Sequence, residues 1–296
     1  MTNPGKKFRD AVNAAMKDGA PLHIIGVADG SDALEAEHAG FKAIYLSGSQ
    51  MAASRGWADI GRLELRHVLE AIERIMDSGV QVPLLVDIDT GFDDVAETIE
   101  KIEALGVAAV HLEDQEDLKA CGHLPGKHVV SKDAATARVA KAVAAKKNAD
   151  FVLMARTDAL AVEGMEKTLA RISAYTEAGA DMIFAEAFPD SATYADVKKA
   201  AQGKPVLCNM TEFGRVELKT PTEIAQETQG NVDIVLNPLS VYRGQRETAA
   251  RMYKEIKTSG SQRDLANQGQ LQTREYFQDL IGYSEQVAAR AKALAS

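Results

Sequence analysis

Eight short apolar runs recur along the chain, and segments with a helical pattern separate them. Each run is short and continuous, as expected for parallel strands that are buried on both faces. The runs cover residues 22–29, 43–49, 83–91, 108–115, 151–159, 181–187, 205–210 and 233–240. The pattern therefore predicts eight strands that alternate with helices.

The segments between these runs place apolar residues at helical spacing. The segment 93–106 also begins with acidic residues, which favour the positive end of a helix dipole. Its predicted apolar face consists of Val95, Ile99, Ile102 and Leu105. Three helices are predicted to end at glycines, because this residue adopts the left-handed conformation without strain: Gly40, Gly106 and Gly179.

Eight strands that alternate with helices predict a (β/α)8 barrel of the TIM type, in the α/β class. An open doubly wound sheet is the second choice, but the sequence lacks the G-x-G-x-x-G turn that such a sheet should carry. We expect one barrel domain over residues 1–296, with a C-terminal helical extension over about 244–296. These helices exceed what one barrel needs, so the last is expected to pack against another subunit.

The chain carries a formal net charge of -9 over 296 residues. This charge argues against broad binding to nucleic acid or to an anionic membrane, but it allows a local basic pocket for an acidic metabolite. The two cysteines form no CxxC pair, which suits a reduced cytoplasm. No apolar stretch predicts a signal peptide or a membrane span, so we expect a cytoplasmic protein without a membrane partner.

Polar residues follow the predicted strands, at the end where barrels of this kind place their active sites. Asp87 and Asp89 follow the third run, Glu113 the fourth and Glu186 the sixth. Side chains two apart on a strand share a face, so the two aspartates should point the same way. Neighbouring carboxylates repel unless a cation or a proton lies between them, and oxygen ligands suit Mg²⁺. Alternatively, these acids cap the turns and helices that follow, and His111 is an ordinary hydrogen-bonded barrel residue.

A basic residue and a hydroxyl-rich segment at the same end indicate an anionic ligand. Arg156 follows four apolar residues, and a guanidinium group binds carboxylates bidentately. Ser47, Gly48 and Ser49 offer hydroxyls and accessible backbone N–H groups for a second carboxylate or an oxyanion. Both features have ordinary alternatives, since arginines and Gly-Ser turns are common on protein surfaces.

Cys121 lies in a connection of about sixteen residues, 116–131, a length that suits a lid over an active site. Lys119 and His123 flank it and would stabilise its thiolate. Free cysteines are usually buried small hydrophobic residues, which fits Cys208 within "PVLCNM" but does not fit Cys121. We therefore predict a chemical role for Cys121.

The motifs "VDIDTG", "LEDQ", "KACGHLPGK", "MARTDA" and "NMTEFG" together resemble the isocitrate lyase/phosphoenolpyruvate mutase superfamily, most of all its bacterial 2-methylisocitrate lyase branch. The similarity runs from about residue 5 to about residue 277, almost the whole chain. The K-x-C-G-H loop is specific to the branch that breaks carbon–carbon bonds. The resemblance implies a (β/α)8 barrel and a homotetramer in which the last helix swaps between subunits.

The resemblance also implies a role for each matching residue. Cys121 would be the catalytic acid, and Tyr45, on the strand face of Ser47, is the candidate base. The implied site for Mg²⁺, or alternatively Mn²⁺, consists of Asp87, Asp89, Glu113 and Asp59. The expected substrate-binding residues are Ser47, Gly48, Ser49, Gly122, His123, Arg156, Glu186, Asn209, Thr211, Arg243 and Arg274.

The activity that the resemblance implies is the Mg²⁺-dependent cleavage of 2-methylisocitrate to pyruvate and succinate in propionate catabolism. A base would remove the proton of the substrate hydroxyl, and the adjacent carbon–carbon bond would break. The metal would hold the 2-oxoacid as a Lewis acid, and the thiol would protonate the other fragment. The expected partner is a small di- or tricarboxylate.

The sequence departs from the lyase pattern at four positions: Ser49, Ala120, Leu124 and Ala185. Ala120 and Leu124 replace two arginines of the cysteine loop, which weakens the case for a tricarboxylate and favours a dicarboxylate such as 2,3-dimethylmalate. An oxaloacetate hydrolase or a phosphonate mutase on the same barrel is a further alternative. The non-enzymatic alternative is a metabolite-binding barrel without activity, but the intact acid, metal and arginine positions argue against it.

Overall fold

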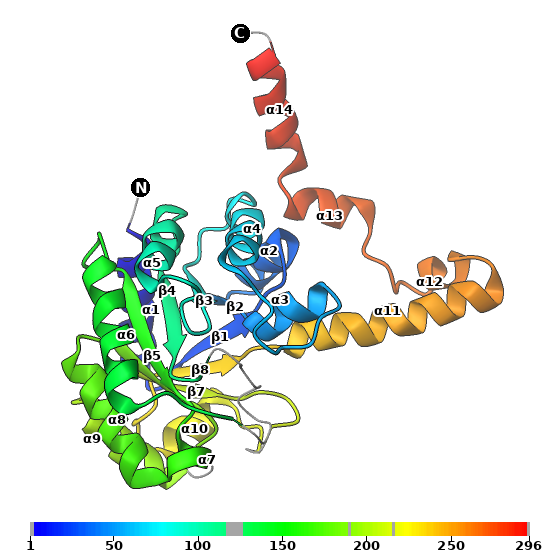
Figure 1. The fold of residues 1–296 in the computed structure, drawn as a ribbon. Helices are drawn as coiled ribbons and strands as arrows, with labels where there is room; N and C mark the ends of the chain where they lie inside the picture. The colour runs from blue at the N-terminus through cyan, green and yellow to red at the C-terminus, as the bar shows by residue number, and fades with distance from the viewer. Residues whose placement is uncertain (1–2, 117–126, 189–190, 215–216, 295–296) are drawn as a thin grey trace.

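The computed structural model describes residues 3–116, 127–188, 191–214 and 217–294, which form a closed barrel of eight parallel strands (Figure 1). Each strand pairs with its neighbours in sequence, and β8 pairs with β1 to close the barrel. All eight strands lie within the predicted apolar runs, so the predicted TIM-type barrel is confirmed. They are β1 (Leu22–Gly26), β2 (Ile44–Leu46), β3 (Leu84–Asp87), β4 (Ala109–Glu113), β5 (Val152–Thr157), β6 (Met182–Ala185), β7 (Val206–Asn209) and β8 (Ile234–Asn237).

Helices surround the barrel (Figure 1). α1 (Pro4–Lys17) precedes β1, and a short 3-10 turn, η1 (Ser191–Thr193), precedes α9. None of the described helices combines the length and the apolar character needed to cross a bilayer. The helices that follow the strands are α2 (Gly30–His38), α3 (Gly48–Ser54), α4 (Leu65–Met76), α5 (Val95–Ala104), α6 (Lys132–Ala145), α7 (Leu160–Glu163), α8 (Met165–Glu177), α9 (Tyr194–Ala200) and α10 (Pro221–Glu227).

Two apolar layers form the core because successive strand residues point to opposite faces. The layer inside the barrel is joined by residues of α1 and includes Phe8, Val12, Ile24, Leu85, Met154, Phe184 and Leu236. The layer between strands and helices includes Ile44, Val86, Val110, Leu153, Ile183 and Val235. The inward-facing positions become polar at the carboxyl ends of the strands, which places the predicted site residues around the mouth of the barrel.

The helix ends follow the predicted local chemistry. The predicted helix 93–106 is α5, and Asp94 caps it by accepting hydrogen bonds from the backbone N–H groups of Ala96 and Glu97 at 2.7 and 3.3 Å. Its predicted apolar face is buried except for Leu105, which is partly buried. The three glycines predicted to end helices all have positive φ angles: Gly40 (+95°), Gly106 (+82°) and Gly179 (+102°).

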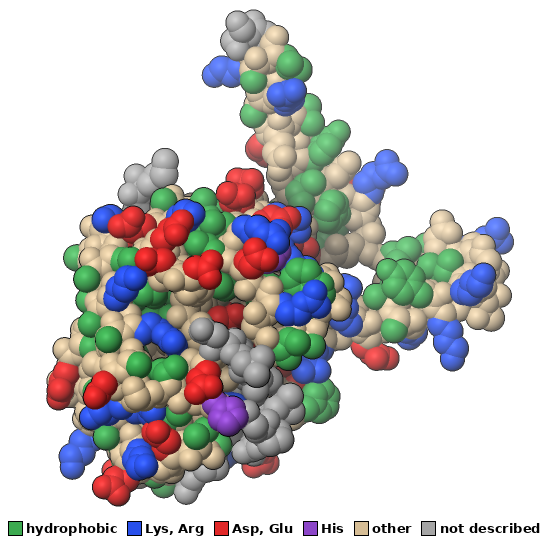
Figure 2. Space-filling model, viewed as in Figure 1, with side chains coloured by type: hydrophobic (Ala, Val, Ile, Leu, Met, Phe, Trp, Pro, Cys, Tyr) green, Lys and Arg blue, Asp and Glu red, His purple; other side chains and the backbone are tan. Residues whose placement is uncertain are grey.

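Four helices follow the last strand, in agreement with the predicted C-terminal helices: α11 (Ser240–Ser259), α12 (Arg263–Asn267), α13 (Arg274–Leu280) and α14 (Tyr283–Leu294). α11 contacts β1 and then runs away from the barrel, whereas α13 returns to pack against α2 (Figure 1). Hydrophobic side chains are exposed along this arm (Figure 2): Tyr253, Ile256, Leu271, Tyr276, Phe277, Tyr283, Val287 and Leu294. The domain bounds and the helix exchange stay predictions.

Candidate active site

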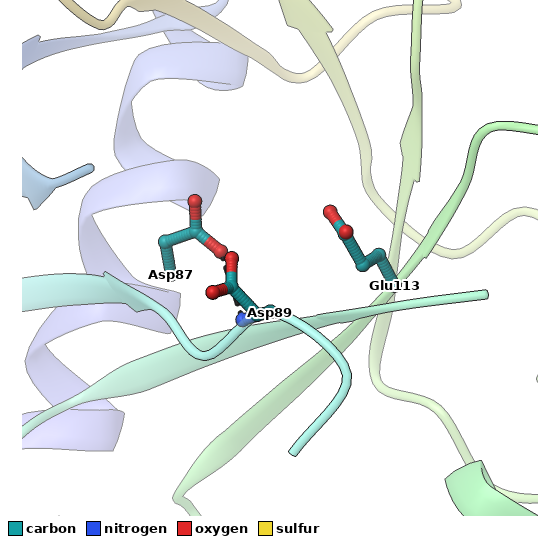
Figure 3. A group of neighbouring side chains, drawn as sticks. All are labelled: Asp87, Asp89 and Glu113. Atoms are coloured by element: carbon teal, nitrogen blue, oxygen red, sulfur yellow. Dashed lines mark hydrogen bonds between the residues drawn. The ribbon is translucent and has the colours of Figure 1, made fainter. Parts of the chain in front are cut away.

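Three carboxylates meet at the mouth of the barrel, where β3 and β4 end (Figure 3). Asp87 is the last residue of β3, Glu113 is the last residue of β4, and Asp89 lies in the turn after β3. All three are buried, and one oxygen atom of each lies within 4.8 Å of the others. Figure 3 shows the carboxylates of Asp87 and Asp89 side by side, with Glu113 directed toward them from the neighbouring strand.

Strand register and a left-handed residue bring these carboxylates together. Asp87 lies opposite His111 of β4, two residues before Glu113. The backbone N–H of Glu113 donates to the carbonyl oxygen of Asp89 at 2.9 Å, and the Asp89 N–H donates to Asp87 Oδ1 at 3.0 Å. The two aspartates lie together as expected but do not share a strand face, because β3 ends at Asp87 and Asp89 follows in a turn with a φ of +48°. Aspartate is one of the few residues besides glycine that adopt this conformation.

Gly48, the first residue of α3, lies directly against the same carboxylates. Its backbone N–H donates to Asp87 Oδ2 at 3.0 Å. An ideal Cβ atom at this position would lie 2.8 Å from Asp87 Oδ2 and 3.1 Å from Asp89 Oδ1, so a larger residue would push on both. The preceding Ser47 caps α3, since its Oγ accepts from the Gln50 N–H at 3.4 Å. The Ser-Gly-Ser segment therefore borders the acidic group, as the sequence predicted.

Tyr45 and His111 form a buried polar pair beside Asp87. The Tyr45 hydroxyl lies 2.9 Å from His111 Nε2 and 3.5 Å from Asp87 Oδ2. His111 Nε2 is also 3.7 Å from Asp87 Oδ1. The residue predicted as the candidate base thus lies next to the acidic group, with a second proton acceptor within hydrogen-bond distance.

Arg156 lies on the other side of the acidic group and is almost fully buried. Its Nε and Nη2 atoms donate to the Asp158 carboxylate at 2.8 and 3.2 Å. Nε is 3.5 Å from Glu113 Oε2, Nη2 is 3.8 Å from Glu186 Oε2, and the guanidinium carbon is 5.0 Å from the Phe184 ring centroid. Burial alone would lower the pKa of Arg156, but the three carboxylates raise it well above its usual range. Arg156 is therefore a permanent cation at the mouth.

Glu186 and Asn209 extend the polar mouth across β6 and β7. The Asn209 side-chain amide donates to Glu186 Oε2 at 3.2 Å, and Glu186 is buried. The Oδ1 atom of Asn209 is buried and has no hydrogen-bond partner among the described residues. Thr211 lies two residues beyond Asn209 and is partly buried. These side chains offer hydrogen-bond acceptors and donors to a polar ligand.

A cavity of about 660 Å³ opens beside Ser49, at the start of α3. Its lining includes Phe213, Tyr242 and Arg243, so two predicted substrate-binding residues share this cavity. The Arg243 guanidinium carbon lies 5.5 Å from the Phe213 ring centroid, and its Nε atom lies 3.9 Å from Glu212 Oε2. The cavity therefore combines apolar walls with two arginines, Arg243 and Arg246, and one carboxylate, Glu247.

The sequence family described as phosphoenolpyruvate phosphomutase matches residues 13–256. The chain belongs to this family. Among curated relatives in it, the 2-methylisocitrate lyase of Shewanella oneidensis is 43% identical and covers 94% of this chain and 93% of that protein. The 2-methylisocitrate lyase of Vibrio cholerae is 44% identical, covering 96% of this chain and 92% of that protein.

Solved structures agree with the family assignment. A crystal structure of 2,3-dimethylmalate lyase, a member of the phosphoenolpyruvate mutase/isocitrate lyase superfamily, is 30% identical and covers 99% of this chain and 96% of that one, with a TM-score of 0.86. Oxaloacetate acetylhydrolase in complex with 3,3-difluorooxalacetate is 30% identical over 98% and 97% of the two chains, also with a TM-score of 0.86. The resemblance and the enzymatic class that the sequence predicted are confirmed.

The contacts among the described residues do not test the roles predicted for five site residues. Arg274 begins α13, which packs against α2, and no described hydrogen bond or ion pair links it to the strand ends. Asp59 lies between α3 and α4, outside the three-carboxylate group found among the described residues. Cys121, Gly122 and His123 lie outside the described residues. The roles of all five stay predictions.

Asp158 and Lys127 are buried at the mouth but were not among the predicted site residues. The Lys127 ammonium lies 3.1 Å from Asp158 Oδ1, and both side chains are buried. Burial alone would raise the pKa of Asp158, but Arg156 and Lys127 lower it to about 2. Arg156 and Asp158 lie only two residues apart in "ARTDA", at the end of β5, so their closeness in sequence could have indicated the contact. Lys127 is 31 residues from Asp158 and carries no such signal.

Cys208 is buried on β7, in agreement with its predicted role as a small hydrophobic residue. Burial raises the pKa of its thiol to about 12, although a hydrogen bond with Tyr194 opposes the shift. Its side chain belongs to the apolar layer between the strands and the helices, not to the polar mouth of the barrel. Cys208 therefore does not take the role predicted for Cys121.

Proposed function

We propose that this protein is a magnesium-dependent carbon–carbon lyase that cleaves 2-methylisocitrate to pyruvate and succinate. The observation that carries the proposal is the match to curated 2-methylisocitrate lyases, at 42–44% identity over 94–96% of the chain. The chemistry of the barrel mouth supports it. Carboxylates that suit a hard cation lie there beside a buried arginine that suits an anionic substrate.

We assign Mg²⁺ to Asp87, Asp89 and Glu113. Buried carboxylates whose oxygen atoms lie within 4.8 Å of one another repel unless a cation or a proton lies between them. Oxygen ligands suit Mg²⁺, which keeps some waters and takes further ligands from substrate, and Mn²⁺ accepts a similar ligand set. When bound, the ion supplies a Lewis acid for the oxygen of the substrate that becomes the 2-oxo group.

Tyr45 is the proposed general base. Its phenolic oxygen can accept the substrate hydroxyl proton once its own proton has passed to His111 Nε2, 2.9 Å away. Asp87 Oδ1, 3.7 Å from that ring nitrogen, would stabilise the resulting positive charge. The two side chains are buried, so a proton exchanged between them stays out of bulk water.

Arg156 is the proposed partner of a substrate carboxylate, because it is charged, buried and close to the acidic group. When the carbon–carbon bond breaks, its electron pair moves to the carbon next to the carboxylate of the succinate fragment. Cys121 is the proposed donor of the proton that this carbon then takes up. That assignment rests on the K-x-C-G-H motif of the sequence.

A second candidate substrate is 2,3-dimethylmalate. The solved 2,3-dimethylmalate lyase has the same fold over almost the whole chain. Ala120 and Leu124 also remove two arginines expected for a tricarboxylate. Hydrolysis of oxaloacetate is the third candidate, supported by the likeness to oxaloacetate acetylhydrolase.

The test is release of 2-oxoacid by the purified protein with Mg²⁺ from 2-methylisocitrate, isocitrate and 2,3-dimethylmalate, with Cys121→Ser in parallel. We expect pyruvate from 2-methylisocitrate, with loss of activity after chelation and in the variant. Turnover of dimethylmalate alone would keep the lyase mechanism and change the substrate. No product from any of the three would refute the lyase proposal, and oxalate from oxaloacetate would then identify the hydrolase.

We further propose a homotetramer in the cytoplasm. The exposed apolar side chains of α11 to α14 support the assembly, since such a surface on a projecting arm needs a partner. A second copy would cover it, with the last helix exchanged as the family resemblance implies. Light scattering after gel filtration tests the mass, and Phe277→Glu should reduce it. A monomeric wild-type protein would refute this proposal.

A further inference from the structure

Asp158 is the centre of a buried ion cluster that we call the mouth cluster, consisting of Arg156, Asp158 and Lys127. The carboxylate is fully buried and accepts two hydrogen bonds from Arg156, at 2.8 and 3.2 Å. Its Oδ1 atom also accepts from the Lys127 ammonium at 3.1 Å. Its backbone N–H donates to the buried Asp114 carboxylate at 2.9 Å. Asp158 is therefore fixed from both its backbone and its side chain.

The bidentate contact decides which carboxylate Arg156 faces. Glu113 and Glu186 lie 3.5 and 3.8 Å from guanidinium nitrogens, beyond ordinary hydrogen-bond distance, whereas Asp158 is within it. Without the Asp158 charge, the guanidinium would move toward these two acids, because a buried cation seeks the nearest anion. Pairing with Glu113 would then compete with the proposed metal, and Arg156 would leave its place for substrate.

Lys127 links this pair to residues 127–131, the segment that leads into α6. Two backbone hydrogen bonds hold this segment beside the end of β4: Glu116 N–H donates to the His128 carbonyl (3.1 Å), and Val130 N–H donates to the Asp114 carbonyl (3.0 Å). Lys127 is the first residue of this segment, and its side chain is buried against Asp158. A lysine is seldom buried unless it is paired. Its ammonium therefore completes the charge balance of the carboxylate that holds Arg156.

We propose that Asp158 and Lys127 are positioning residues for substrate binding: Asp158 holds the Arg156 guanidinium away from Glu113, and Lys127 holds Asp158. The inference rests on the proposed function in one respect, namely that a substrate carboxylate binds at Arg156. It adds two residues that touch neither substrate nor metal but determine how well both bind.

The opposite end of the barrel supplies a matched control. Asp181, directly before β6, binds Arg9 Nη2 and the Lys146 ammonium, each at 2.7 Å. This second cluster has the same Arg–Asp–Lys composition, and its Lys146 side chain is also largely buried. It lies at the amino end of the strands, away from the acidic group. Changes there should affect stability and leave substrate binding intact.

The experiment compares Asp158→Asn, Lys127→Met and their double variant with Asp181→Asn and Lys146→Met, all as full-length protein. Thermal unfolding, kcat and KM for 2-methylisocitrate, and Mn²⁺ affinity without substrate are measured for each. We expect both mouth variants to raise KM at least tenfold, with a smaller fall in kcat. Asp158→Asn should also weaken Mn²⁺ binding at least fivefold, because Arg156 then pairs with Glu113. Lys127→Arg should stay within threefold of the wild type.

The double variant tests whether Lys127 acts through Asp158. If it does, the KM of the double variant matches that of Asp158→Asn within twofold. The control variants should lower the melting temperature similarly and leave KM and Mn²⁺ affinity within twofold. If Asp158→Asn shifts KM no more than Asp181→Asn does, the cluster is structural and the positioning role is refuted. If the wild type does not cleave 2-methylisocitrate, the proposed function fails. The positioning role is then tested by measuring the binding of pyruvate and succinate by calorimetry. Equal affinity in wild type and Asp158→Asn would overturn the positioning role.

Discussion

Replacing Gly48 with alanine should weaken metal binding without weakening the fold. The new Cβ atom would lie 2.8 Å from Asp87 Oδ2 and 3.1 Å from Asp89 Oδ1, so both carboxylates must move by a few tenths of an ångström. The backbone itself accepts alanine, because Gly48 does not have a left-handed φ and begins a helix. The strain therefore falls on the carboxylates and not on the chain.

The size of the effect follows from how closely metal ligands must be placed. Ligand distances at metal sites vary by about 0.2 Å, and disturbing the groups that orient ligands costs roughly 10- to 100-fold in affinity. We expect a loss in this range for Gly48→Ala, or about 1.4–2.7 kcal/mol of binding free energy. In the metal-free protein, a gain of about 0.4–1 kcal/mol from the stiffer unfolded chain offsets part of the new contact. The metal-free melting temperature should then change little.

The assay is titration of metal-stripped protein with Mn²⁺ by electron paramagnetic resonance and with Mg²⁺ by calorimetry. Gly244→Ala is the matched control, because Gly244 lies in the helix α11 and a Cβ atom there meets nothing within 4 Å. Its metal affinity should equal that of the wild type. Wild-type affinity in Gly48→Ala would refute the assignment of the ion to Asp87 and Asp89. A large loss of metal-free stability would instead refute the steric argument.

Three further outcomes are expected. Glu113→Gln should abolish the rise in melting temperature that Mg²⁺ gives the wild type, because a neutral amide replaces a charged oxygen ligand. An equal Mg²⁺ shift in both proteins would contradict the site. The folded-state pKa of Asp158, about 2, lies below its unfolded value of about 3.9, so its ionisation stabilises the fold above about pH 4. That stability, about 2 kcal/mol, is lost as the pH falls toward 2. Urea unfolding should therefore depend less on pH in Asp158→Asn over this range, and identical slopes would count against the pairing. In Cys121→Ser, the buried Cys208 with its pKa of about 12 should react with a thiol reagent at pH 8 only after denaturation, and rapid labelling of the native variant would disagree.

The barrel could be predicted because parallel strands buried on both faces leave uninterrupted apolar runs, and all eight runs contain a strand. Asp87, Glu113 and Arg156 could be predicted as neighbours because strand ends converge at one end of a barrel. The left-handed turn at Asp89 could not, since only a small fraction of aspartates adopt a positive φ angle. The contact of Lys127 with Asp158 was also missed, because it depends on how the chain returns after a long connection.

The charges at the mouth bear on the order in which ligands bind. Carboxylates outnumber cations among the described groups there: Asp87, Asp89, Glu113, Asp158 and Glu186 against Arg156 and Lys127. Because these carboxylates outnumber the two cations, the described groups carry a net negative charge that repels a carboxylate substrate. A divalent cation reverses this balance at the acidic group, so substrate affinity should depend on the metal being bound first. Calorimetric titration of metal-free protein with pyruvate should give no measurable heat, and binding should appear when Mg²⁺ is added. Equal pyruvate affinity with and without Mg²⁺ would mean that Arg156 recognises the carboxylate unaided, and the acidic group would then need another explanation.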